Sequence, residues 1–157
     1  MDCACHILWP GGNTTALIEG NIEVSRRNAL AHEVIRLCPD VEQVGFLLTP
    51  QDPAADLHLE MNGGEFCGNA TRSAAFYWSK ITGKKHLQIE VSGMDELVDA
   101  VSTDDDCSIL LPPEMVRSIR DLPEGIMVDL EGISHLIIDG PTVPQKEIHH
   151  LLQPHKE

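Results

Sequence analysis

The sequence predicts an α+β fold in which predominantly β-structure surrounds one long helix. Short runs of alternating apolar and polar residues recur between turn signals, and this pattern is typical of half-buried strands. One longer stretch, from about 68 to 81, instead places its apolar residues at helical spacing, and Gly83 follows it as a C-cap. The 157 residues have room for one full domain and part of another.

Four strands and one helix are predicted before this central helix. Proline and glycine lie together between Trp9 and Asn13, so the strands on either side should be joined by a turn as a hairpin. Ser25 is a favourable N-cap for a helix that ends at Leu37, shortly before Pro39. The predicted strands cover residues 3–8, 14–19, 44–48 and 56–61.

Three alternating runs follow the central helix and predict a β-meander. Ser92-Gly93 and the acidic stretch 104–106 supply the turns between them, and Pro112-Pro113 ends the last run. The three predicted strands cover residues 86–91, 96–101 and 107–111.

The character of the chain changes after these prolines. We expect an N-terminal domain over residues 1–113, a charged linker over 114–124, and the first strands of a truncated second domain over 125–157. Two isolated strands, 126–130 and 135–138, cannot form a core of their own. We therefore expect either the missing second domain or self-association to cover them.

The composition narrows the classes of partner and site. A net charge of −14 disfavours nucleic acid and anionic membrane surfaces, so we expect neither as a partner. No apolar run approaches the ~18 residues that a membrane span needs, and no signal peptide is recognisable. The five cysteines are irregularly spaced, which predicts reduced thiols in a cytoplasmic protein and no metal site.

Cys67 is the strongest candidate for chemistry. It lies at the predicted start of the central helix, after Gly63-Gly64 and directly before Gly68. Backbone N–H groups are unpaired at a helix N-terminus, where the helix dipole favours negative charge. Such a position favours the thiolate form of a cysteine and can also bind a carboxylate.

The segment Glu65-Phe-Cys-Gly-Asn-Ala-Thr-Arg72 resembles the Cys-Gly-Asn-x-x-Arg signature of the diaminopimelate epimerase family, whose members are amino-acid racemases and epimerases related in fold to proline racemase. Pro10-Gly-Gly-Asn13 is similar to the N-terminal Gly-x-Gly-Asn hairpin of that family. Gly132-Ile-Ser-His135 is similar to a Gly-Asn-Pro-His segment early in the family's second domain. The order and approximate spacing agree, so the resemblance covers essentially the whole chain.

The resemblance implies a cofactor-independent enzyme of two similar domains, each with β-strands wrapped around a central helix. One cysteine from each domain reaches the α-carbon of an amino-acid substrate, and one thiolate removes the proton while the other thiol delivers one. Cys67 would be one of these acid/base groups, and the amides of Gly68 and Asn69 would hold the substrate carboxylate. Asn13 and Asn62 would contact polar groups of the substrate.

Two departures from the family pattern limit what the resemblance implies. The second cysteine belongs to a region that this sequence does not include, and Cys107 does not replace it because it begins a predicted strand. Ile133 and Ser134 stand where the family has Asn-Pro, so we expect a substrate other than diaminopimelate, either another amino acid or an imino acid of the proline type. The alternative is a catalytically incomplete binding or assembly domain that keeps the fold and a carboxylate pocket.

Overall fold

A computed structural model describes residues 3–130, 133–141, 144 and 147–148 of the chain. The chain divides into two compact units, Met1–Leu111 and Pro112–Glu157.

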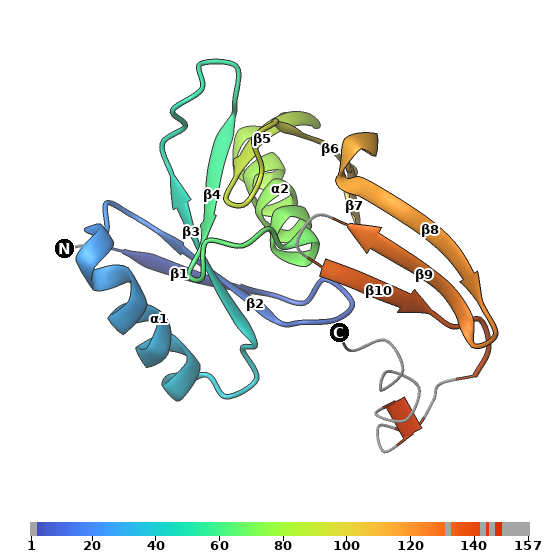
Figure 1. Ribbon diagram of the computed structural model, residues 1–157. Helices are drawn as coiled ribbons and strands as arrows, with labels where there is room; N and C mark the ends of the chain where they lie inside the picture. The colour runs from blue at the N-terminus through green and yellow to red at the C-terminus, as the bar shows by residue number, and fades with distance from the viewer. Residues whose placement is uncertain (1–2, 131–132, 142–143, 145–146, 149–157) are drawn as a thin grey trace. The chain divides into compact units, whose positions relative to one another are not determined.

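The first unit is a seven-stranded mixed sheet that curls around a helix as a half-barrel (Figure 1). The strands follow in chain order, with parallel pairing for β2–β3 and β4–β5 and antiparallel pairing elsewhere. The α+β prediction and the predicted meander are therefore confirmed. The strands are β1 (Ala4–Leu8), β2 (Thr15–Glu19), β3 (Gln43–Leu48), β4 (Leu57–Met61), β5 (His86–Val91), β6 (Val98–Ser102) and β7 (Cys107–Leu110).

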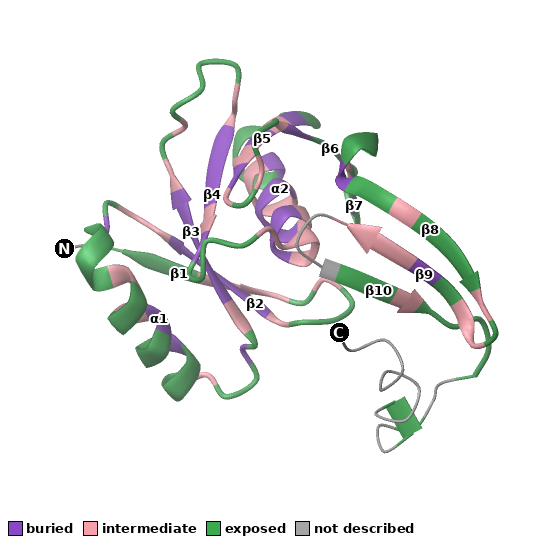
Figure 2. Ribbon diagram, viewed as in Figure 1, coloured by how far each residue is buried: buried purple, intermediate pink, exposed green. Residues whose placement is uncertain are grey.

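Helix α2 (Gly68–Thr82) is the element around which the sheet curls, and it packs against strands β2 to β7. Its small residues Ala70, Ala74 and Ala75 are fully buried, which lets the sheet approach the helix backbone closely. Gly83 ends the helix in the left-handed conformation, with φ of 77°, as the sequence predicts. Figure 2 shows the buried residues concentrated in this helix and the strands around it.

Helix α1 (Val24–Leu37) covers the opposite face of the sheet, against β3. Alternation along the strands separates two cores, because Leu17 and Leu47 pack in the cluster with α2 while Ile18 and Phe46 pack in the cluster with α1. The predicted cap of α1 is wrong: the helix begins at Val24 after Glu23, and no side chain caps it, so Ser25 lies inside its first turn.

The second unit is a three-stranded antiparallel sheet in the order β10-β9-β8. It contains a short 3-10 helix, η1 (Pro113–Met115), followed by β8 (Val116–Leu122), β9 (Gly125–Leu130) and β10 (Ile133–Ile137). Residues 114–124, for which we expected a linker, thus hold a strand whose charged side chains are largely exposed. Gly132 and residues 149–157 lie outside the described part of the chain.

Candidate functional site

Cys67 is the N-cap residue of α2, as its place in the sequence predicts. Its Sγ accepts a hydrogen bond from the backbone N–H of Ala70 at 3.5 Å, and its carbonyl accepts from both the backbone N–H and the hydroxyl of Thr71. The amides of Gly68 and Asn69 precede these, and helix geometry leaves them no carbonyl of the same helix to bind. The thiol and two amides without a helical acceptor therefore share the positive end of one helix.

Gln43, the first residue of β3, is the group that holds the thiol from the sheet. The thiol of Cys67 donates a hydrogen bond to Gln43 Oε1 at 3.0 Å. Gln43 Nε2 in turn donates to Thr15 Oγ1 at 2.6 Å and to the carbonyl of Asn13 at 3.3 Å. The sequence pattern does not single out Gln43; its signal there is a polar residue directly before the buried run 44–48.

The carboxamide of Gln43 accepts from the neutral thiol through its oxygen, while its nitrogen is occupied by two donor bonds. Those bonds, to Thr15 at the start of β2 and to Asn13 in the β1–β2 loop, hold the carboxamide in this orientation.

The β1–β2 loop approaches the first turn of α2. Asn13 has a positive φ of 43°, a conformation that asparagine adopts more readily than most residues. A Cβ added at Gly12 would lie 4.0 Å from Asn69 Nδ2. The structure thus brings Asn13, Cys67, Gly68 and Asn69 to one end of the helix.

Asn62, in the turn after β4, makes its side-chain hydrogen bond to helix α1. Its side chain donates to Asn28 Oδ1 of α1 at 3.2 Å, and its backbone N–H donates to the carbonyl of Val44. Asn62 therefore ties the turn after β4 to α1, and its contact with a substrate stays a prediction.

The loop before Cys67 is held tightly by the turn after β5. Ser92 Oγ donates to the carbonyl of Glu65 at 2.9 Å and accepts from the backbone N–H of Met61. A Cβ at Gly93, whose φ is 76°, would lie 2.5 Å from the backbone N of Phe66. Only glycine fits this approach, which fixes the position of the residue before Cys67.

The other four cysteines occupy positions unlike that of Cys67. Cys107 is buried at the start of β7, where burial raises the pKa of its thiol. Its carbonyl accepts from Arg72 Nε at 2.9 Å, and the same guanidinium pairs with Asp106 at 3.1 Å, so Arg72 braces the sheet edge. Cys3 and Cys5 are exposed, and Cys38 is the C-cap of α1.

The described residues were also compared with what a metal site and a membrane-spanning helix require. They contain no group of three His, Cys, Asp or Glu side chains arranged to hold a metal ion. None of the helices in this part of the chain has the length and apolar character that crossing a membrane requires.

Comparison with known proteins relates this chain to a family of racemases. The family model described as "Histidine racemase CntK N-terminal domain" matches residues 7–156. A histidine racemase of Fusobacterium nucleatum is 34% identical over 146 residues, which cover 83% of this chain and 52% of that protein. A histidine racemase of Staphylococcus aureus is 35% identical over 101 residues, which cover 60% of this chain and 36% of that protein. The chain thus spans between about a third and a half of the length of these curated relatives.

Proposed function

We propose a function from one premise: the chain belongs to the family of histidine racemase N-terminal domains. The proposed function is that of the N-terminal part of an amino-acid racemase that inverts the α-carbon of histidine. Cys67 acts as one of its two acid/base groups. The observation that carries the proposal is the thiol of Cys67 at the N-cap of α2, beside the amides of Gly68 and Asn69.

In the proposed reaction, the Cys67 thiolate removes the α-proton, so a C–H bond breaks and an S–H bond forms. The electron pair left on the α-carbon delocalises into the substrate carboxylate. The amides of Gly68 and Asn69 stabilise that developing charge, because preorganised donors at a helix N-terminus need no reorganisation during the reaction. A second acid delivers a proton to the opposite face, and no cofactor takes part.

The second acid comes, in this proposal, from the half of the enzyme that this sequence does not include. The resemblance to diaminopimelate epimerases implies a cysteine in that role. Cys107 does not supply it, because it is buried in β7 and its pKa is raised.

The test is exchange of the α-proton of L- and D-histidine in deuterated water. The sample contains this chain together with the second half of a family racemase, and a panel of other amino acids is measured in parallel. Cys67→Ser should abolish exchange, whereas Cys3→Ser, which changes an exposed thiol, should leave it intact. If unmodified protein exchanges no amino acid, the racemase proposal fails; if it exchanges others but not histidine, only the substrate is wrong.

A second candidate is a binding or assembly domain that retains the carboxylate pocket without catalysis. The observation that favours it is the position of the other four cysteines, none of which lies at a helix N-terminus. This reading predicts that Cys67 is alkylated no faster than the exposed Cys3. Faster alkylation of Cys67 would support acid/base chemistry.

A further inference from the structure

The half-barrel of the first unit has a cavity at the end remote from Cys67. Strands β2 and β3 both begin near Cys67, where Gln43 accepts from its thiol, and both end at this cavity, which is lined by Glu19 and Leu48. Helix α2 begins at Cys67 and brings Trp78, near its other end, to the same cavity. The cavity has a volume of about 560 Å³ and is separate from the candidate catalytic site.

The carboxylate of Glu19 is held through one of its two oxygens. Tyr77 Oη donates to Glu19 Oε2 at 2.8 Å, and His6 Nε2 lies 3.4 Å from the same oxygen. Burial and the hydrogen bond to Glu19 raise the pKa of Tyr77 to about 12, so its hydroxyl remains a donor near neutral pH. Within the described part of the chain, no donor bonds to Glu19 Oε1. That oxygen is available to a ligand.

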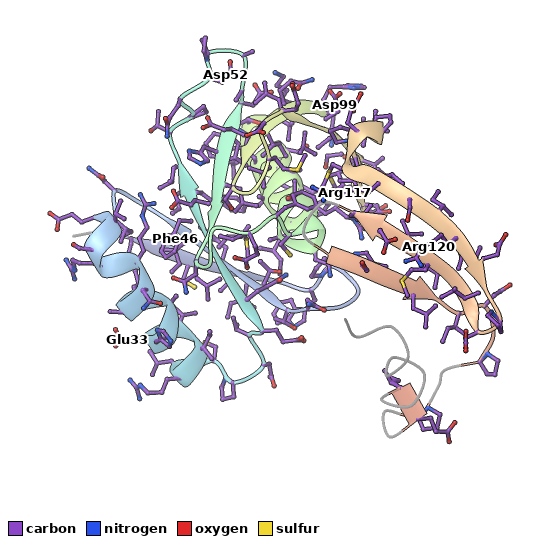
Figure 3. All side chains as sticks on the ribbon, viewed as in Figure 1. Glu33, Phe46, Asp52, Asp99, Arg117 and Arg120 are labelled. Atoms are coloured by element: carbon purple, nitrogen blue, oxygen red, sulfur yellow. The ribbon has the colours of Figure 1, made fainter. Side chains whose placement is uncertain are left out.

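The walls of the cavity around Glu19 are largely aromatic and apolar. Trp78 of α2, Leu47 of β3 and Pro50 line it together with Glu19. Pro50 lies in the β3–β4 loop, in which Asp52 is labelled in Figure 3. Of the lining residues, all within the described part of the chain, Glu19 is the one with an ionisable side chain. A carboxylate beside an indole ring favours a ligand that is cationic and partly apolar, because the cation can pair with the carboxylate and contact the ring face.

We propose that this cavity binds a small organic cation of the alkylammonium or arylalkylammonium class. The ammonium group donates to Glu19 Oε1 and lies against the indole of Trp78, and the apolar body contacts Leu47 and Pro50. An amino acid is a poorer ligand, because its carboxylate would approach Glu19 in a chain whose net charge is −14. The inference therefore concerns a second site and a second class of ligand, and it does not depend on the racemase reaction.

The test is a titration of the full chain followed by nitrogen–proton NMR. The probe is phenethylammonium, and its neutral isostere 2-phenylethanol is the control ligand. The chain has two tryptophans, so the indole N–H signal of Trp78 reports on the cavity while that of the exposed Trp9 reports on non-specific binding. Phenethylammonium should shift the Trp78 signal to saturation and leave the Trp9 signal in place. The neutral isostere should bind about tenfold more weakly, because it cannot form the charge-assisted bond.

A variant with the same shape tests the carboxylate. Glu19→Gln keeps an oxygen that accepts from Tyr77 but has no charge, so it should weaken phenethylammonium binding about tenfold and leave 2-phenylethanol binding unchanged. Unchanged binding of the neutral ligand also shows that the variant retains the cavity. Glu96→Gln, which removes an exposed charge elsewhere, is the matched control and should leave both affinities unchanged. The proposal is overturned if Trp78 does not respond, if Trp9 responds equally, if both ligands bind alike, or if Glu19→Gln has no effect.

Discussion

The sheets of the two units differ in how many of their faces are buried. In the first unit, Leu17 packs in the cluster with α2 and its neighbour Ile18 packs in the cluster with α1, so β2 is buried on both sides. In the second unit, Ile119 and Ile137 belong to a face that remains exposed. A sheet completes a core only when each of its apolar faces is covered, and among the described residues this is seen for the sheet of the first unit.

The largest expected effect is a difference in the free energy of unfolding between two alanine variants, one from each sheet. Leu17→Ala should lower the free energy of unfolding by about 2–5 kcal/mol, because a fully buried side chain leaves a cavity. Ile119→Ala should change it by less than about 0.5 kcal/mol, because the side chain is exposed. Urea unfolding of the chain measures both, and equal losses would contradict the comparison.

A second prediction compares substitutions at two glycines of the first unit, and it tests whether the tight packing extends to the loop before Cys67. Gly83 and Gly93 have almost the same φ, 77° and 76°, but only at Gly93 would a Cβ meet neighbouring atoms. Gly83→Ala should cost about 1 kcal/mol of stability from backbone strain alone. Gly93→Ala should cost more and should also alter the alkylation rate of Cys67. If the two variants are equally stable, the loop is not held as described.

A third prediction concerns the hydrogen bond between Gln43 and Cys67. Gln43→Leu removes the hydrogen bond that holds the Cys67 thiol toward β3, a contribution of about 1 kcal/mol. Alkylation of Cys67 should become faster because the released thiol reaches the reagent more often, while α-proton exchange falls because the thiol is no longer positioned. Gln51→Leu, in the loop after β3, is the matched control and should leave both rates unchanged. An unchanged alkylation rate in the Gln43 variant would show that Gln43 does not influence the Cys67 thiol.

The smallest expected effect is the pH dependence of stability that Asp129 contributes in the second unit. Hydrogen bonds from Ser118 and Ser134, together with Arg120, lower the pKa of Asp129 from 3.8 to about 2. A carboxylate with a lowered pKa stabilises the folded state above its unfolded pKa, and this contribution is lost as the pH falls from about 4 to about 2. Carbon NMR of the Asp129 carboxyl should show its midpoint near 2. Ser118→Ala should move that midpoint upward; an unmoved midpoint would assign the shift to another cause.

Much of the first unit could be predicted from local patterns. Glycine at 83, the turn signals at Ser92-Gly93 and the alternation of residues 86–91 each determine their structure through neighbours in sequence. Cys67 at the helix start was predictable for the same reason. The substrate that the names of the relatives give, histidine, could not be predicted in this way. Recognition of a substrate side chain depends on groups that the sequence pattern does not bring together.

The errors have physical causes that local patterns do not contain. Ser25 satisfies the composition of a cap, but α1 begins one residue earlier and packs against β3 without one. Residues 114–124 looked like a linker because Arg117, Arg120 and Asp121 interrupt the apolar alternation, yet an edge strand tolerates charges toward solvent. Gln43 was missed because its contact with Cys67 spans 24 positions of the sequence.

That spacing has a consequence for the order in which the protein folds. The network that holds the Cys67 thiol joins three segments, with 30 positions between Asn13 and Gln43 and 24 between Gln43 and Cys67. Contacts that close such long loops form late, after local hairpins and helices. Pulsed alkylation during refolding should find the environment of Cys67 established only after the β5–β6–β7 meander. The alkylation rate of Cys67 then reports on a late step in the assembly of the first unit.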